Sequence, residues 1–345
     1  MKAAKPKKKV KKILLIILVI VVLFLLFTFI RHRIMLKQEK DIVKPIGQMI
    51  DVDGHKMCVY TEGSGAKTLV FMSGSGTISP ILDFKSIYPK LTDKYRIAVV
   101  EKFGYGYSEQ VDKPRDVASL LADTRAALAG AGVEAPYVLC PHSYSGIEAL
   151  YWAQTYPDEV EAIIGLDMCV PECYDYTRDG KLAVTYYRLL HGLVNLGIGR
   201  YVSDSTLLPS GDFLTDEECK TWVALFNRNY GNISVARECN KAKDNAAVVS
   251  SMDKPEVPML LFVSTGEGTS MQDKWRDIFY RYADGMPDIK MIELDCAHYI
   301  FHFEADKMTK EIALFLDGLT APQRISELVS VCVKKMQHHA INSGL

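Results

Sequence analysis

Short apolar runs alternate with amphipathic helical patterns over most of this 345-residue chain. Several of the runs are apolar throughout, as in strands that are covered on both faces. Alternation of this kind predicts an α/β fold with a doubly wound, mostly parallel sheet of eight strands. The predicted strands span residues 48–52, 57–61, 68–72, 96–101, 137–140, 162–167, 259–264 and 289–294, and the predicted core helices span 81–92, 115–131, 145–156, 272–283 and 299–316.

The alternation stops between Asp167 and Pro258, where no strand pattern occurs. A connection of this length needs structure of its own in a compact domain, and helical patterns recur within it. We therefore predict a helical lid at 171–255, inserted into a core formed by 47–170 and 256–320. The predicted lid helices span 182–194, 215–230 and 234–250, and a C-terminal tail at 321–345 contains one amphipathic helix at 323–336.

A long apolar run lies near the N-terminus, from Ile13 to Ile30, and only Thr28 interrupts it. As a helix it would be about 27 Å long, close to the roughly 30 Å hydrocarbon core of a bilayer. A secretory signal peptide is the alternative, but its apolar region is usually about 7–15 residues long and precedes a small-residue cleavage site, which is missing here. We predict a transmembrane anchor at 13–30, after a basic segment at 1–12 and before a polar linker at 31–46.

Charge is distributed unevenly along the chain. Residues 1–40 hold eleven Lys and Arg and one acidic residue, a net charge of +10, and the remainder has a net charge of −11. The lysines before the apolar run place the N-terminus in the cytoplasm and the globular part outside it, at the cell membrane. An acidic globular part argues against a nucleic-acid partner, because phosphate binding needs a basic face.

The eight cysteines form no zinc pattern. Cys169 and Cys173 are the only close pair, and neither a second pair nor a histidine cluster completes a metal site. Scattered buried thiols are expected, and disulfides outside the cytoplasm are the alternative that the spacing leaves open. No metal and no organic cofactor is implied.

A serine stands between a predicted strand and a predicted helix. Ser143 lies within the segment Pro-His-Ser-Tyr-Ser-Gly at 141–146, which follows the apolar strand and opens the next helix. This arrangement is typical of a nucleophile elbow, a sharp turn that exposes a serine hydroxyl. A helix N-cap is the alternative role for this serine. His298, after the last predicted strand, stands where a general base for the serine is expected.

These motifs, in this order, resemble the α/β-hydrolase superfamily, specifically its lid-bearing branch with proline iminopeptidases, esterases and epoxide hydrolases. The resemblance covers residues 46–320. The segment 141–146 is similar to the family's Gly-His-Ser-x-Gly-Gly elbow, with Pro141 and Ser145 in place of two glycines; 99–108 is similar to its Asp-x-x-Gly-x-Gly-x-Ser segment, and 71–76 to its His-Gly oxyanion turn. Epoxide hydrolases carry Asp at the nucleophile position, so Ser143 implies acyl transfer instead.

The resemblance assigns His298 as the base that takes the proton of Ser143, with His302 as the alternative. The acid that orients the base has two candidates. Asp167 ends the sixth predicted strand and would project at the carboxyl edge of the sheet beside the serine. Glu267 follows the seventh strand, where most of the family carries its acid. We favour Asp167.

An oxyanion hole needs two backbone N–H donors aimed at the developing negative charge. The resemblance assigns these donors to Tyr144, directly after the serine, and to Gly74 or Ser75. The run of small residues at 73–76 permits close approach of the backbone to a ligand.

Three lid residues are candidates for substrate binding. Tyr174 and Tyr176 could form an aromatic wall, which suits a mostly apolar substrate with one polar group; packing within the lid is the alternative. Glu172 is a candidate for binding a substrate amine, as acidic lid residues do in iminopeptidases.

The sequence therefore predicts a membrane-anchored serine hydrolase that cleaves an ester, thioester or small amide through an acyl-enzyme intermediate. Two alternatives stay open. One is a proline iminopeptidase-like aminopeptidase that acts on a peptide substrate. The other is a ligand-binding protein that kept the fold and lost turnover.

Overall fold

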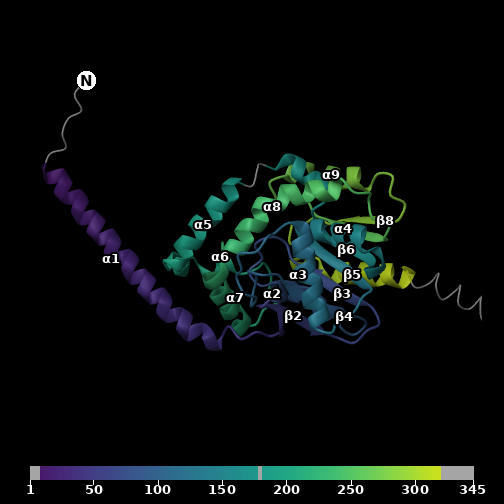
Figure 1. Ribbon diagram of the computed structural model, residues 1–345, viewed down its shortest axis with the longest axis horizontal. Coiled ribbons are helices and arrows are strands. Elements are labelled where there is room, and N and C mark those ends of the chain that lie inside the picture. Colours follow the sequence, from purple (N-terminus) through teal and green to yellow (C-terminus); the bar gives the residue numbers. More distant parts are fainter. Residues whose placement is uncertain (1–7, 178–180, 320–345) are drawn as a thin grey trace, which may run out of the picture.

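One sheet of eight strands forms the centre of the molecule (Figure 1), whose computed structural model describes residues 8–177 and 181–319. The strands lie in the spatial order β1-β2-β4-β3-β5-β6-β7-β8. The pairs β1–β2 and β2–β4 are antiparallel, and every other pair is parallel. The predicted eight-stranded, mostly parallel sheet is therefore confirmed. The strands are β1 Gln48–Val52, β2 His55–Glu62, β3 Thr68–Met72, β4 Arg96–Glu101, β5 Tyr137–Ser143, β6 Val160–Met168, β7 Met259–Val263 and β8 Ile289–Glu293.

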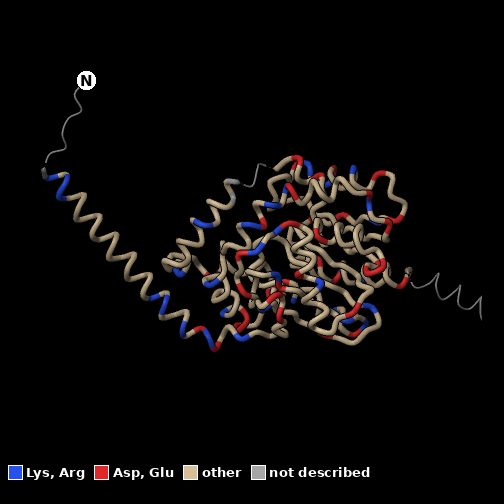
Figure 2. The backbone as a smooth tube through the Cα atoms, in the orientation of Figure 1, with Lys and Arg blue, Asp and Glu red and all other residues tan. Residues whose placement is uncertain are grey.

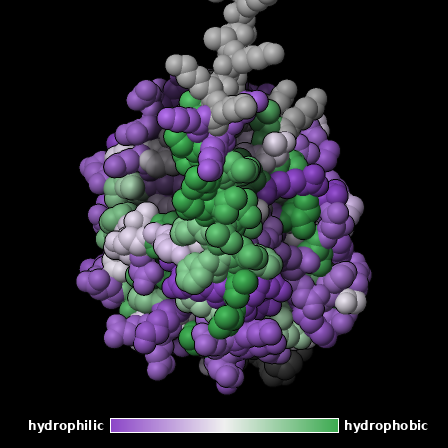
Figure 3. Space-filling model, turned by 90° about the vertical axis from the view of Figure 1, so that its left-hand side faces the viewer, coloured by the Kyte–Doolittle hydropathy of each residue, from purple (hydrophilic) through white to green (hydrophobic). Residues whose placement is uncertain are grey.

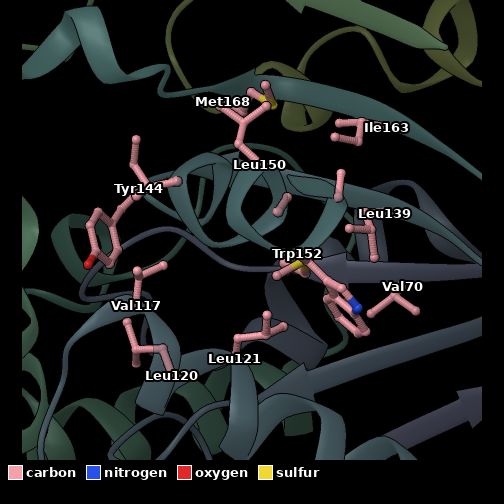
Figure 4. Packing of buried hydrophobic residues seen from close by; sticks show 14 of the residues in the cluster. Val70, Val117, Leu120, Leu121, Leu139, Tyr144, Leu150, Trp152, Ile163 and Met168 are labelled. Atoms are coloured by element: carbon pink, nitrogen blue, oxygen red, sulfur yellow. The ribbon is translucent and has the colours of Figure 1, made fainter. Parts of the chain in front are cut away.

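Helices cover both faces of the sheet. On one face lie α3 Val117–Gly130, α4 Ser145–Thr155 and α9 Trp275–Ala283, and their apolar side chains join those of the strands in one cluster. Figure 4 shows Trp152 of α4 beside Val70 and Leu139 of the sheet, and Leu120 of α3 beside Val117. Because strand side chains alternate between faces, the neighbours of Val70 belong to a second apolar cluster on the opposite face.

Two predicted core helices differ from the structure. Residues 81–92 form only a single turn, α2 Pro80–Asp83, followed by 3₁₀ turns at Phe84–Ser86 and Tyr88–Lys90. Pro89 lacks the N–H that a continuing helix needs, so the longer helix was a wrong prediction. Residues 299–316 begin with a 3₁₀ turn, Ile300–His302, and residues 305–319 are helical. The tail helix predicted at 323–336 lies outside the described residues.

The described residues between β6 and β7 form helices and turns, and we call residues 171–255 the lid. Thr215 and Glu218 form a reciprocal capping box at the start of α7, and the Asn232 side chain caps α8. In Figure 1 these helices lie together on the side of the core that faces α1. The lid elements are η5 Pro171–Tyr176, α5 Lys181–Asn195, η6 Ile198–Tyr201, α6 Asp204–Leu207, α7 Asp216–Asn229 and α8 Ile233–Ser250.

The N-terminal apolar run lies in a single long helix, α1 Lys8–Gln38. It is the one helix in the described residues that is long and apolar enough to cross a membrane, and most of its apolar side chains are exposed. Figure 2 shows Lys and Arg at both ends of this helix and none along its middle. Within the polar linker predicted at 31–46, the helix continues through residue 38 and a 3₁₀ turn, Glu39–Asp41, follows it.

Candidate active site

Ser143 occupies a sharp turn between β5 and α4. Its φ is +51°, in the left-handed region that few residues other than glycine adopt. Two glycines leave the necessary space: a Cβ on Gly74 would come within 2.8 Å of the serine Cβ, and one on Gly146 would overlap the carbonyl oxygen of Cys169. The elbow geometry predicted from the sequence is therefore present, and the serine is half-buried at its tip.

Ser145 replaces a glycine of the family's elbow, and its hydroxyl has a structural role. The Ser145 Oγ donates to the carbonyl oxygen of Met72, at 2.6 Å, and accepts from the N–H of His142 at 3.0 Å. These bonds join the end of β3 to the turn after β5. The hydroxyl therefore fastens the elbow to the neighbouring strand.

His298 and Asp167 form a close pair at the carboxyl edge of the sheet. The Nδ1 of His298 lies 2.6 Å from the Asp167 Oδ2, and both residues are buried. The carboxylate also accepts from Ser264, through N–H at 2.7 Å and Oγ–H at 2.6 Å, and from the Trp275 indole N–H at 2.8 Å. Four donors therefore fix the orientation of one carboxylate.

Electrostatics at this pair favour the protonated imidazole. Burial alone would lower the pKa of His298, but the hydrogen bond and negative charge of Asp167 outweigh it and raise that pKa above the ordinary 6.5. Asp167 itself has a φ of +53°. Only three residues other than glycine have positive φ in the described ranges, namely Asp53, Ser143 and Asp167.

The two alternative residues are placed differently. Glu267 has an exposed side chain, and it contacts His298 through its backbone oxygen, which accepts the histidine N–H at 2.9 Å. His302 pairs instead with Asp83, whose Oδ1 lies 2.9 Å from the His302 Nε2. The geometry thus favours Asp167 over Glu267 and His298 over His302.

Ser143 and His298 have neighbouring side chains in common. The ring of His142 packs 4.7 Å from the ring of His298 and lies immediately before Ser143 in the chain. The thiol of Cys169 interacts with Cys173, His298 and the serine, and together they lower the pKa of Cys169. Within the described residues the Ser143 hydroxyl makes no hydrogen bond to the His298 ring; such bonds are often long until substrate binds.

The loop at 73–76 lies directly beside the elbow. In the part of the chain that the structure describes, the N–H groups of Ser75 and Tyr144 donate to no protein acceptor. The next N–H, that of Gly76, donates to the Tyr105 hydroxyl at 3.1 Å, and this hydroxyl donates to Glu238 at 2.5 Å. A buried tyrosine–glutamate pair therefore holds the loop while leaving two N–H groups free for a ligand.

A cavity of about 520 Å³ opens between the core and the lid. His298, Thr77 and Tyr299 stand at its core side, and apolar lid side chains form much of the rest. Ser143 is not among the residues that line it. The apolar lid lining consists of Val202, Leu207, Leu208, Pro209, Trp222 and Phe226.

None of the three predicted substrate-binding residues of the lid lines this cavity. Glu172 and Tyr174 line a separate hollow of about 340 Å³. Tyr176 faces the outer surface, where its hydroxyl accepts from Arg281 at 3.0 Å and the Lys274 ammonium lies 4.2 Å from its ring centre. The aromatic lid residues that line the cavity are Tyr230, one of the lid tyrosines, and Trp222 and Phe226, which the sequence did not single out.

Several site residues carried no signal in the sequence. Ser264 and Trp275 bind Asp167 from positions about a hundred residues later, and Asp83 contacts His302 from the opposite half of the chain.

No group of three or more His, Cys, Asp or Glu side chains in the described ranges could hold a metal ion, and the seven cysteines there are free thiols.

Comparison with known proteins gives a relative that matches most of the chain, and many similar folds. No family model matches the chain. The chain is 35% identical over 289 residues to the uncharacterized protein YbdG of Bacillus subtilis (strain 168), a match that covers 82% of this chain and 89% of that protein.

Two solved structures illustrate the similarity of fold. ALR0039, a putative α/β hydrolase from Nostoc sp. PCC 7120, aligns with a TM-score of 0.63 at 15% identity, over 78% of this chain and 97% of that chain. The epoxide hydrolase VrEH1 from Vigna radiata aligns with a TM-score of 0.60 at 16% identity, over 79% and 97%. At these identities the two structures inform on the fold and not on the reaction.

Proposed function

Because this chain has the α/β-hydrolase fold and belongs to the family of the Bacillus subtilis protein YbdG, we propose that it is a serine hydrolase acting through an acyl-enzyme intermediate. Ser143 is the nucleophile, His298 the general base and Asp167 the acid that orients it. The substrate is an ester, thioester or small amide. The proposal requires no cofactor.

In the first half-reaction the His298 Nε2 takes the hydroxyl proton as the Ser143 Oγ bonds to the substrate carbonyl carbon. The carbonyl oxygen becomes an oxyanion, which the N–H groups of Tyr144 and Ser75 receive. The bond to the leaving group then breaks. The leaving group departs with the bonding electron pair and takes the proton from the imidazolium, and the acyl group remains on Ser143.

Water completes the cycle on the acyl-enzyme. It gives a proton to His298 as its oxygen bonds to the acyl carbon, and a second oxyanion forms in the same place. When the bond from carbon to the serine oxygen breaks, the imidazolium returns the proton to Ser143. The products are a carboxylic acid and the free enzyme.

The backbone strain carries the proposal. A left-handed φ at a residue other than glycine costs about 1–3 kcal/mol and persists where the surroundings enforce it, often at functional sites. Two of the three such residues in the described part of the chain are Ser143 and Asp167. They come from different strands. Asp167 binds the buried His298 directly, and Ser143 follows His142, whose ring packs against that of His298.

The cavity at His298 supports an acyl substrate more than a peptide amine. Its lid side is apolar, and the Glu172 carboxylate, the candidate for binding an amine, does not line it. The two acidic residues that do line it are Asp83, which pairs with His302, and Glu267, both outside the lid. The apolar lid side therefore favours an acyl group. We further propose that α1 anchors the enzyme in the cell membrane with the catalytic domain outside the cytoplasm, since lysines precede its apolar run.

A substrate panel tests the reaction class. Purified full-length protein in detergent is assayed on p-nitrophenyl esters and on aminoacyl anilides, as wild type, as Ser143→Ala and as the control Ser251→Ala, which removes an exposed hydroxyl at the end of α8. We expect ester hydrolysis by the wild type and the control and none by Ser143→Ala. Equal rates in the folded Ser143→Ala variant would contradict the proposal.

A further inference from the structure

The lid helix α5 exposes an apolar stripe along one face. Leu182, Tyr186, Leu189 and Leu193 follow each other at intervals of four, three and four residues, so they lie on one line of the helix. Their exposed fractions include 79% for Leu182, 64% for Leu189 and 57% for Tyr186. A row of large apolar side chains on a soluble surface usually marks a contact with something else.

The inner face of α5 is already occupied. Val194 is buried, and the helix packs against α7 and α8 within the lid. The stripe is therefore the unpartnered face of an amphipathic helix whose other side belongs to the lid. What covers it must be found outside the described globular part.

The far end of α1 is attached to the lid just after α5. The buried Arg200 guanidinium donates to the Glu39 carboxylate at 2.7 Å and to the His32 Nδ1 at 3.2 Å. Gly197 packs against the backbone of Thr28, and both Thr28 and His32 are buried while most of their neighbours on the helix are exposed. This contact fixes the lid beside the C-terminal turns of α1.

The contact also fixes how close the lid comes to the apolar run. The ring of Tyr201, in η6, lies 6.0 Å from the ring of Phe24 and 5.7 Å from the guanidinium carbon of Arg31. Phe24 stands six residues before the end of the run at Ile30, a distance of about 9 Å along a helix. Tyr201 therefore sits level with the last apolar turns and the first cation, where tyrosine is enriched at membrane surfaces.

The figures show how α5 is oriented relative to α1. In Figure 1 α5 runs across the direction of α1, on the side of the lid from which α1 extends. Figure 3 looks onto this side, and hydrophobic side chains gather there, those of the apolar run of α1 among them. If α1 crosses a bilayer, α5 lies along the bilayer surface with its stripe available to the lipid, which is the arrangement of an interfacial amphipathic helix.

The cavity begins at the same place. Val202, the neighbour of Tyr201, is partly exposed and lines the cavity, whose lining continues through Leu207 and Leu208 to His298. Tyr187 of α5 lines an adjoining cavity of about 250 Å³ that shares several lining residues with the first. One cavity, apolar along much of its lid side, therefore extends from beside the α1 contact to the candidate base.

We propose that the stripe of α5 rests in the outer lipid layer around α1, and that the cavity takes the acyl chain of an ester drawn from that layer. The inference rests on the proposed hydrolase function and on α1 as the anchor. It adds a substrate class, membrane-borne acyl esters, and a route by which the chain enters. The bilayer is the favoured occupant of the stripe because the apolar run of α1 continues beside it.

Lipid contact is tested without any reaction. Full-length protein is placed in vesicles of phosphatidylethanolamine and phosphatidylglycerol with brominated acyl chains, which quench nearby tryptophan. The matched variants are Tyr186→Trp on the stripe and Tyr280→Trp on α9, whose tyrosines are 57% and 53% exposed. We expect quenching above the wild-type background for Tyr186→Trp and none for Tyr280→Trp. Equal quenching of the two would overturn the proposal.

A second arm tests the substrate class. The rate on p-nitrophenyl palmitate in vesicles is divided by the rate on p-nitrophenyl acetate in solution, for the wild type and for Leu182→Asp/Leu189→Asp. We expect this ratio to fall about tenfold or more in the double variant, because two charges oppose burial in the interface. An unchanged ratio would overturn the inference. So would a stripe that can be cross-linked to a second copy of the chain while brominated lipid leaves the fluorescence of Tyr186→Trp unquenched. A wild type that hydrolyses neither ester refutes the proposed function and leaves the quenching result to decide the lipid contact.

Discussion

Replacing Asp167 by Asn would test the assignment of the acid most sharply. The two carboxylate oxygens have different partners: Oδ1 accepts from the Ser264 N–H and the Trp275 indole, whereas Oδ2 accepts from His298 and the Ser264 hydroxyl. An asparagine must keep its carbonyl oxygen toward the Ser264 N–H and the Trp275 indole N–H, because these two groups can only donate. Its NH₂ group then faces His298 and the hydroxyl.

This orientation reverses the tautomer of the imidazole. The asparagine NH₂ donates to the His298 Nδ1, so the ring proton moves to Nε2, which can no longer accept the serine proton. Loss of the correct tautomer costs about 10⁴ in rate in a serine hydrolase of known mechanism, or about 5.5 kcal/mol in the barrier. The Ser264 hydroxyl can turn to accept from the amide, so we expect the variant to fold.

The assay is kcat/KM on p-nitrophenyl acetate, with circular dichroism to establish folding. Glu267→Gln is the matched control, because its side chain is exposed and it meets His298 through the backbone alone. We expect a loss of about three to four orders of magnitude for Asp167→Asn and less than about twofold for Glu267→Gln, since an exposed carboxylate contributes little. The reverse ranking would move the acid to Glu267 and refute the reasoning.

Four further predictions concern the charged pair and the elbow. Because Asp167 raises the pKa of His298, and the neutral imidazole is the base, kcat/KM should fall as the pH decreases through a value above 6.5. Asp167→Asn removes the two largest causes that oppose the effect of burial on this pKa, so it should shift the fall in kcat/KM to lower pH. The same pKa shift predicts how stability depends on pH. The charged His298–Asp167 pair stabilises the folded protein fully below the ordinary histidine pKa, and this contribution is lost as the pH rises through the raised pKa of His298 in the folded protein. In urea unfolding, the free energy of His298→Ala should therefore lack this pH dependence; an identical pH dependence in the variant would contradict the pairing. Trp275→Phe removes the indole N–H that donates to Asp167 and should lower kcat/KM by about 10- to 100-fold. The control Trp152→Phe loses a hydrogen bond to Glu159, which lies away from the site, and should keep kcat/KM within about twofold. Equal effects of the two variants would argue against the role of the Trp275 indole. Gly146→Ala should destabilise the protein by about 1–3 kcal/mol in urea unfolding, because the added Cβ would overlap the Cys169 carbonyl oxygen. The control Gly192→Ala in α5 places a Cβ with no atom within 4 Å and should leave the stability unchanged. An unchanged stability of Gly146→Ala would contradict the tight elbow.

The sheet could be predicted from sequence because its central strands, β3 to β7, are buried on both faces. Such strands read as short apolar runs, and each of the eight was found within a few residues of its observed bounds. The elbow was equally visible, since a strand, a small-residue turn and a helix follow each other locally. The helix predicted at 81–92 does not form, although its apolar spacing is helical, because Pro89 lacks the N–H that a continuing helix needs.

The remaining features depend on contacts between distant segments, which local patterns do not encode. Trp275 reaches Asp167 only because α9 packs beside β6, and no periodicity marks that neighbour. Likewise, a lid tyrosine has no pattern that says which way it faces: Tyr176 turns outward to Arg281. The attachment of α1 to Arg200 joins residues more than 160 positions apart and was equally invisible.

The most direct test of the central claim is to locate a covalent label on the serine. Full-length protein is treated with a fluorophosphonate, which reacts with activated serine hydroxyls, and the modified peptide is identified by mass spectrometry in the wild type and in His298→Ala. The account predicts one modified residue, Ser143, and loss of the modification in the histidine variant. Folded wild-type protein that stays unlabelled, or labelling at another serine, would contradict it.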